Sequence, residues 1–154
     1  AINIPLIAAG GIGDGRGVVN ALVAGAEGVQ CGTLFSIAKE SPVGDNWRQA
    51  VIDASDTSTV VVGATIRDAS RAIKNRKTDQ LLELEAQKVS REEFNESMNT
   101  GLRNAVRKDN ADTGVLFSGE IAGMIKESKP AAQIVTDLIE QAQDIINNKK
   151  FDLL

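Results

Sequence analysis

Two short apolar runs, each closed by glycine, constrain the fold of this sequence more than any other feature. Residues 5–9 form the first run and end at Gly10 and Gly11. Residues 27–33 form the second, which contains Gly32. A short apolar run bounded by turn residues is typical of a strand buried in a parallel sheet.

The segment between the two runs has the signals of a helix. Asp14 is a suitable N-cap, and Gly25 stands where a left-handed residue ends a helix. Val18, Val19, Leu22 and Val23 recur at helical spacing. Two strands joined by a helix of about ten residues predict a βαβ unit with a right-handed crossover.

The sequence after this unit predicts mainly helices. Asp45 is expected to cap a helix that carries Trp47, and the β-branched run 58–62 predicts a strand. Ser90 and Glu93 have the spacing of a capping box and predict that a helix begins there.

That helix is expected to run to about Val106, with Gly101 weakening it. Pro130 begins the clearest helix of the sequence. Its apolar stripe consists of Ala131, Ile134, Val135, Leu138, Ile139, Ala142, Ile145 and Ile146. We therefore divide the chain into a βαβ part (1–57), a strand-plus-helical part (58–128) and a C-terminal amphipathic helix (129–154) that packs back on the preceding fold.

The composition excludes several classes of function. The 154 residues include no histidine and a single cysteine, so neither a Cys/His zinc site nor a Ser-His-Asp triad can form, and we assign no metal ligand or catalytic residue. A net charge of -4 argues against nucleic-acid binding. No run of about 20 apolar residues suggests a membrane span, and no signal peptide is recognisable, so a cytoplasmic protein is expected.

The glycine-bearing strand ends are the residues best suited to chemistry. Main-chain N–H groups that converge without intervening side chains bind a phosphate dianion well, and Thr33 offers a hydroxyl group beside them. The loops after the last two strands of a (β/α)8 barrel form such a site. Alternatively, Gly10 and Gly11 only make a tight turn and Gly32 only relieves crowding.

Several segments resemble one known family. They are 4–12, 25–35, 38–41, 71–75, 101–106 and 118–123, and they are similar to the nitronate monooxygenase (2-nitropropane dioxygenase-like) family, which includes the FMN-dependent enoyl-acyl-carrier-protein reductase II. The resemblance implies an α/β fold, namely the C-terminal portion of a (β/α)8 TIM barrel with its last two strands and helices, followed by a mainly helical segment. This sequence departs from the family pattern at Asp68, where histidine is expected, and at Glu120, where glutamine is expected.

The resemblance also implies a cofactor and a reaction. The residues that would hold the FMN phosphate are Gly10, Gly11, Gln30, Cys31, Gly32 and Thr33. The parent flavoprotein would oxidise a nitronate with oxygen, or pass hydride from NADH or NADPH to an enoyl thioester. The strands that supply the family's catalytic histidine have no counterpart here, so this chain alone is expected to be inactive.

Two alternatives differ from an oxidoreductase fragment. One is a non-catalytic phosphate-ligand-binding or interaction module, and the other is a truncation product that binds nothing. Because the sequence starts without Met and enters a strand almost at once, we expect a fragment of a longer protein. Its exposed apolar surface would then be covered by the N-terminal half or by self-association.

Other residues have competing interpretations. Cys31 is expected to pack in a strand end and not to act as a reactive thiol. Arg71 and Lys74, three positions apart on a predicted helix, form a solvated face or offer charge to a nicotinamide phosphate. Phe94, like Trp47, is expected in the core. Glu120 either faces the cofactor or lies in a surface turn.

Overall fold

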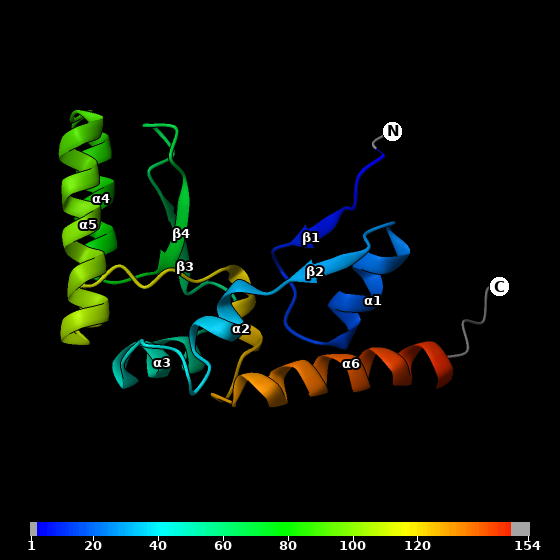
Figure 1. Cartoon of the computed structure of the whole chain (residues 1–154). Helices are drawn as coiled ribbons and strands as arrows, with labels where there is room; N and C mark the ends of the chain where they lie inside the picture. Colours follow the sequence, from blue (N-terminus) through cyan, green and yellow to red (C-terminus); the bar gives the residue numbers. More distant parts are fainter. Residues whose placement is uncertain (1–2, 149–154) are drawn as a thin grey trace.

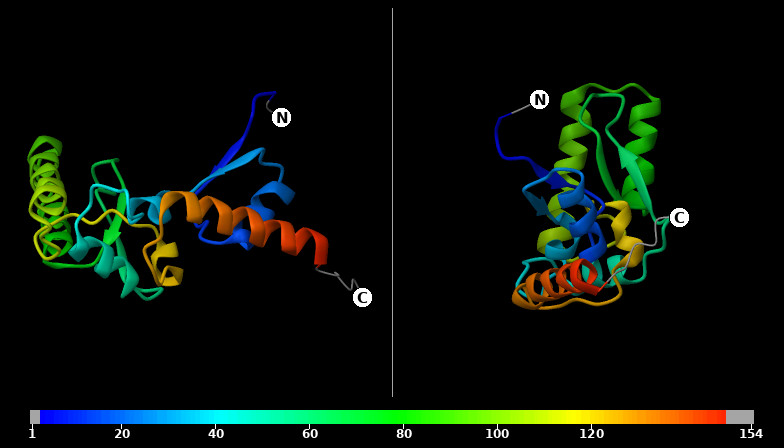
Figure 2. Two further views of the ribbon diagram at one scale, coloured as in Figure 1. Left: turned by 60° about the horizontal axis from the view of Figure 1, so that its bottom comes forward. Right: turned by 90° about the vertical axis from the view of Figure 1, so that its right-hand side faces the viewer.

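The computed structural model describes residues 3–148 and places two α/β parts side by side (Figure 1). β1, β2 and α1 make one part, and the β3–β4 hairpin with α4 and α5 makes the other. α6 runs along the base under α1, as the turned views also show (Figure 2). The elements are β1 (Ile7–Ala9), α1 (Gly15–Val23), β2 (Gly28–Gln30), α2 (Gly32–Ser36), α3 (Asp45–Ile52), β3 (Thr59–Val62), β4 (Ser70–Ile73), α4 (Arg76–Ala86), α5 (Arg91–Lys108), the 3-10 helix η1 (Glu120–Met124) and α6 (Ala131–Asn148).

The first part is the predicted βαβ unit. β1 and β2 are parallel, with Ala9 opposite Gln30, so both strands end at the same edge of the sheet. The Asp14 carboxylate caps α1 by accepting the N–H groups of Arg16 and Gly17 at 3.0 and 3.1 Å. Gly25 follows α1 with a φ of +99°, in the left-handed region, as predicted.

The prediction that the first strand is fully buried is wrong. Ile7 is 53% exposed, whereas Ala8 packs against an apolar cluster around Ile12 and Val18. Successive side chains of a strand point to opposite faces, and here only one face is covered. β1 also has only one sheet neighbour among the described residues, so its other edge is unpaired there.

The second part contains a strand that the sequence did not indicate. The run 58–62 forms β3, as predicted, but it pairs in antiparallel fashion with β4 (Ser70–Ile73). Arg71 therefore lies on a strand and Lys74 just after it, so the helix expected for these two residues is wrong. β4 forms because Ala72 faces Val60 on one side and bridges the distant Phe117 on the other.

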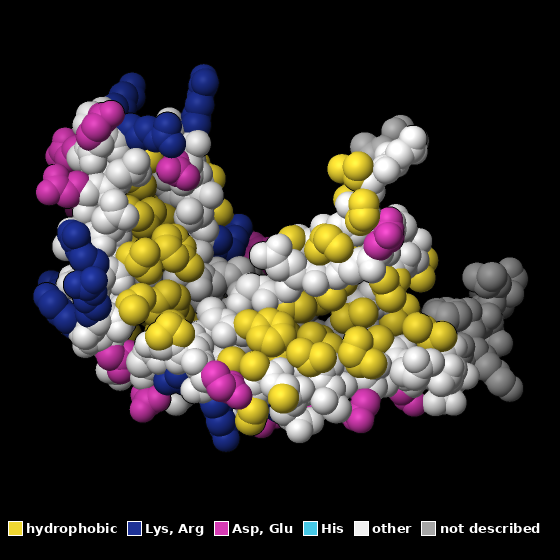
Figure 3. Space-filling view, viewed as in Figure 1, with side chains coloured by type: hydrophobic (Ala, Val, Ile, Leu, Met, Phe, Trp, Pro, Cys, Tyr) yellow, Lys and Arg dark blue, Asp and Glu magenta, His cyan; other side chains and the backbone are white. Residues whose placement is uncertain are grey.

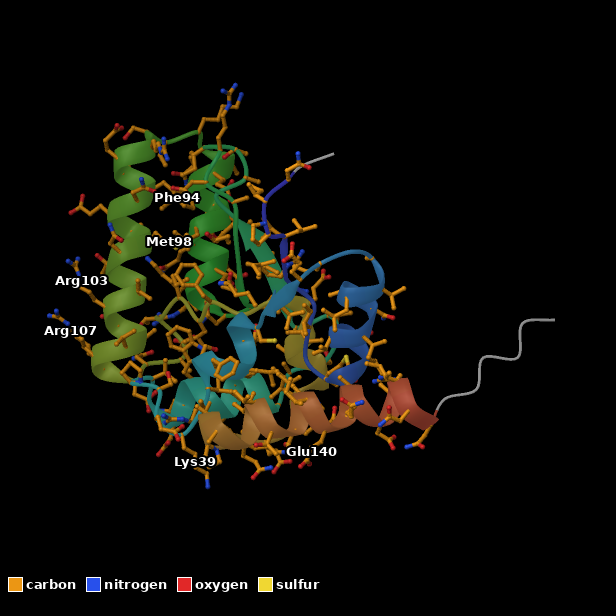
Figure 4. All side chains as sticks on the ribbon, turned by 45° about the vertical axis from the view of Figure 1, so that its right-hand side comes forward. Lys39, Phe94, Met98, Arg103, Arg107 and Glu140 are labelled. Carbon is orange, nitrogen blue, oxygen red and sulfur yellow. The ribbon has the colours of Figure 1, made fainter. Side chains whose placement is uncertain are left out.

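α5 covers this hairpin with its apolar face. Phe94 and Met98 lie on its inner side, whereas Arg103 and Arg107 point away from the molecule (Figure 4). The Ser90 hydroxyl accepts the N–H of Glu93 at 3.1 Å, so the serine half of the predicted capping box forms. Phe94 is 1% exposed, which confirms its predicted place in the core.

Helix α5 continues to Lys108 through Gly101 without a break. A side chain at position 101 would collide with Val115, which is completely buried, and would crowd the buried stem of Lys77. The glycine that was expected to weaken this helix therefore serves its packing.

A distant residue caps α3. The prediction that Asp45 is the N-cap is wrong, because Gly44 occupies that position and Asp45 lies in the first turn. The carboxylate of Asp109, which follows α5, accepts the N–H groups of Asn46 and Trp47 at 3.0 and 3.3 Å. Trp47 itself is buried in the core, as predicted.

α6 buries only part of its apolar stripe. Ile134, Leu138 and Ala142 pack against α1, whereas Val135, Ile139 and Ile146 remain exposed. Apolar side chains also gather at the surface between β1 and α6 in the space-filling view (Figure 3). Residues 149–154 of the predicted C-terminal segment lie outside the described part of the chain, as do residues 1 and 2. Within residues 3–148, none of the helices is both long enough and apolar enough to cross a bilayer.

Candidate phosphate-binding site

A pocket of about 250 Å³ lies where the two glycine turns meet. The parallel register brings the turns together, because Ala9 and Gln30 are opposite each other at the ends of β1 and β2. The residues that line the pocket are Ala9, Gly10, Gly11, Ile12, Gln30, Gly32, Thr33, Gly119 and Ile121. Five of the six residues predicted from the sequence therefore line one cavity.

The glycines of this pocket leave its space open. Gly10 and Gly11 have φ values of +99° and +69°, which L side chains rarely adopt. Gly32 has no such backbone requirement, yet a Cβ at Gly10, Gly11 or Gly32 would meet no atom within 4 Å. Gly32 therefore does not relieve crowding between protein atoms, and the turn interpretation accounts only for Gly10 and Gly11.

Several main-chain N–H groups of the residues that line this pocket have no hydrogen-bond partner among the described residues. The N–H groups of Gly32 and Thr33 open α2, whose N-cap, Cys31, provides no side-chain cap. The first N–H groups of a helix have no partner within it. Among the described residues, the hydrogen bonds also leave the N–H of Gly11 unused. Because α2 has only five residues, these individual amides matter more than a helix macrodipole.

Thr33 joins the turns to a third segment of the chain. Its buried hydroxyl oxygen accepts the N–H of Gly119 at 3.0 Å, which leaves the hydroxyl proton available to a ligand. Gly119 and Ile121 thus form a wall of the pocket that the sequence reasoning did not include. The signal available in the sequence is segment 118–123, which resembles the family through the pattern Ser-Gly-x-Ile-Ala-Gly.

Cys31 lies between two residues of the pocket but does not line it. Its half-buried side chain packs beside the apolar cluster that contains Ile12 and Ala38. Burial raises the pKa of the Cys31 thiol, which disfavours the reactive thiolate. These observations agree with the prediction that this cysteine packs.

The two departures from the family pattern lie at the surface. Glu120 is 69% exposed and forms an ion pair with Arg71, with Oε1 and Nη2 separated by 3.1 Å. Of the two interpretations of Glu120, the structure supports the surface turn. Asp68 is also exposed, and its Oδ2 lies 3.4 Å from Nη2 of Arg91.

The chain belongs to the nitronate monooxygenase family, whose model matches residues 1–141. A probable nitronate monooxygenase from Staphylococcus saprophyticus is 34% identical over 146 residues, which are 95% of this chain and 41% of that protein. FabK from Thermotoga maritima is 35% identical with a TM-score of 0.86, over 94% of this chain and 46% of that one. Nitroalkane oxidase from Streptomyces ansochromogenes is 26% identical with a TM-score of 0.76, over 93% and 40%.

These similarities confirm the family and the fold class predicted from the sequence. The chain is the C-terminal portion of a TIM barrel followed by a mainly helical segment, and it spans less than half the length of these relatives. Membership of an oxidoreductase family also removes support for a non-catalytic module as the alternative function.

Proposed function

We propose that this chain contributes the FMN phosphate site of a flavin-dependent oxidoreductase. The residues that would hold the phosphate are Gly10, Gly11, Gln30, Cys31, Gly32 and Thr33. One observation carries the proposal, namely the open space in front of three glycines whose turns face a common pocket. Packing explains none of these glycines, whereas a ligand that must approach the main chain closely explains all of them.

The chemistry of the pocket suits a phosphate dianion. Its candidate donors are main-chain N–H groups and the Thr33 hydroxyl, and the described residues that line it include no charged side chain. Converging N–H groups bind phosphate through several short hydrogen bonds without competing side chains. Pockets for whole drug-sized ligands are typically about 300–1,000 Å³. The smaller volume here fits the phosphate end of FMN, and the flavin ring would extend beyond it.

The whole protein would perform one of the two reactions of the family. The bound flavin would supply the redox chemistry, either oxidation of a nitronate by oxygen or hydride transfer from NADH or NADPH to an enoyl thioester. This chain would bind and orient the cofactor, and the catalytic groups would come from the part of the relatives that it does not span. The same part, or a second copy of the chain, would cover the exposed apolar residues of β1 and α6.

Comparison of FMN with riboflavin tests the phosphate site directly. The two flavins differ only by the phosphate, and amide NMR spectra of a 16.3 kDa protein report binding residue by residue. FMN and inorganic phosphate are expected to shift the amide signals of Gly11, Gly32 and Thr33, whereas riboflavin leaves them in place. Equal shifts with FMN and riboflavin, or no shifts with FMN, would exclude the proposed site.

Two variants localise the effect. Gly32→Val places a side chain in the open pocket without a backbone conflict and is expected to weaken FMN binding at least tenfold. Thr33→Val removes the hydroxyl proton and is expected to weaken it at least about tenfold, as loss of one hydrogen bond to a charged group does. Thr136→Val on the exposed face of α6 is the matched control and should bind FMN as the unmodified chain does. Unchanged binding by Gly32→Val would show that the phosphate lies elsewhere.

A further inference from the structure

The wall that completes the pocket carries an ion pair. Glu120 stands between Gly119 and Ile121, the two residues that this wall contributes to the pocket. Its Oε1 lies 3.1 Å from Nη2 of Arg71 on β4. Nη1 of the same guanidinium donates to the Thr59 hydroxyl at 3.1 Å, so Arg71 is held from two sides.

The wall is attached to both parts of the molecule. The N–H of Ser118 donates to the main-chain oxygen of Arg71 at 3.1 Å. One residue later, the N–H of Gly119 donates to the hydroxyl oxygen of Thr33 at 3.0 Å. Segment 118–121 therefore bridges β4 and the pocket, and the Arg71 side chain forms its ion pair with Glu120 inside this segment.

The charge of Glu120 is unfavourable for a site that binds an anion. Consecutive Cα atoms are 3.8 Å apart, so the Glu120 carboxylate lies within about 10 Å of the pocket wall. That distance is close to the Debye length of about 8 Å at physiological ionic strength. Because none of the described residues that line the pocket is charged, an unpaired carboxylate at this position would repel a phosphate dianion without local compensation.

We propose that Arg71 is a positioning residue of the phosphate site that neutralises Glu120 and so sets the affinity for the phosphate. This inference rests on the proposed function of the pocket. Arg71 acts through Glu120 and does not contact the ligand. The ligand then meets an uncharged wall, and its phosphate is bound by neutral donors alone.

The proposal predicts effects of opposite sign for the two partners. Coulomb's law for one charge about 8 Å from a dianion in a water-like dielectric corresponds to about a sixfold change in affinity. Arg71→Ala should weaken FMN binding by about sixfold at low salt. Glu120→Gln should strengthen it by up to the same factor, and the double variant should bind FMN as the unmodified chain does. The differences of both single variants from the unmodified chain should fall below about twofold in 0.5 M salt, where screening is strong.

The experiment follows titrations with FMN and with riboflavin by amide NMR for the unmodified chain, the two single variants and the double variant. The FMN titrations give dissociation constants, and the spectra also report whether each variant is folded. Glu120→Gln introduces the residue that the family pattern leads us to expect and should therefore fold normally. Riboflavin lacks the phosphate, and it should leave the amide signals of Gly11, Gly32 and Thr33 in place in every variant, as in the unmodified chain. This matched ligand separates the charge effect from damage to the fold.

Three results would overturn the inference. Equal weakening by Arg71→Ala and Glu120→Gln would show that the ion pair only stabilises the wall. Failure of the double variant to recover would show that Arg71 contacts the phosphate itself. Unchanged FMN affinity in Arg71→Ala, with the unmodified chain still preferring FMN over riboflavin, would refute this inference and leave the phosphate site standing.

Discussion

Asp109 caps α3 although it lies 62 residues from Trp47 in the sequence, so we expect its substitution to lower the free energy of unfolding. Its carboxylate accepts two N–H groups of the first turn of α3, those of Asn46 and Trp47. Asp109 also has a φ of +47°, in the left-handed region that non-glycine residues rarely adopt. Gly44, the N-cap, offers no side chain, and a Cβ there would collide with the Asp109 carboxylate.

The structure sets the size of the effect. Removal of an N-cap side chain costs about 1 kcal/mol, and an alanine in the left-handed region costs about 1 kcal/mol more. Asp109→Ala should therefore lower the free energy of unfolding by about 2 kcal/mol. Asp109→Gly accepts the backbone conformation and should cost about 1 kcal/mol, since relief of strain and the greater freedom of unfolded glycine largely offset each other. Asp109→Asn keeps one acceptor and should cost about 0.5 kcal/mol.

Urea unfolding followed by tryptophan fluorescence measures these differences. Trp47 is the single tryptophan, and it lies buried in the helix that loses its cap. Asp45→Ala is the matched control, because Asp45 is in the same first turn but its side chain is almost fully exposed. This control should cost no more than about 0.5 kcal/mol. If Asp45→Ala costs as much as Asp109→Ala, the near residue supplies the cap and the long-range contact has no energetic role.

Three further substitutions test a hydrogen-bonded carboxylate, a close contact at a glycine and a helix cap by the same urea assay. Burial alone would raise the pKa of Glu85, but hydrogen bonds to its carboxylate outweigh burial and lower this pKa from the usual 4.5. Glu85→Gln should therefore lower the free energy of unfolding by about 2 kcal/mol at pH 7. This loss should shrink as the pH falls below 4.5, because the stability contributed by a carboxyl group with a lowered pKa is lost on protonation. A loss of stability that is independent of pH would contradict this explanation. Gly101→Ala should destabilise by about 1–2 kcal/mol, since the clash with Val115 exceeds the gain in helix propensity, and a stabilised variant would show that the core yields. Asp14→Ala should cost about 1 kcal/mol through loss of the α1 cap, and no loss of stability would remove the cap from the account of that helix.

Local patterns in the sequence were sufficient for the βαβ unit and for α6. Asp14 and Gly25 mark the ends of α1 because each acts on the backbone within a few residues of its own position. Apolar spacing located α6, because a helix repeats its buried face at short range. These predictions required no knowledge of the rest of the chain.

The elements that failed depend on distant partners. β4 contains Arg71 in a short segment without a strong strand pattern, and its pairing with β3 and Phe117 decides its conformation. Asp45 has the correct residue type for a cap but is the first residue of α3, and the carboxylate of the distant Asp109 accepts the N–H groups of the first turn. The exposed face of β1 was missed for a related reason, since an apolar run does not show which face is covered.

The candidate site combines both kinds of information. The part of the pocket made by the two glycine turns follows from local patterns, because parallel strands that end in glycine turns bring those turns together at one edge of the sheet. Its wall does not, because Gly119 donates to Thr33 across 86 residues of sequence that include β3, β4 and α5. Segment 118–121 is fixed to β4 by Ser118, so disorder in the helical part would open the pocket even with both glycine turns intact. The second part of the chain therefore stabilises the pocket between the two turns of the first, so the proposed phosphate site would need the segment that follows these turns.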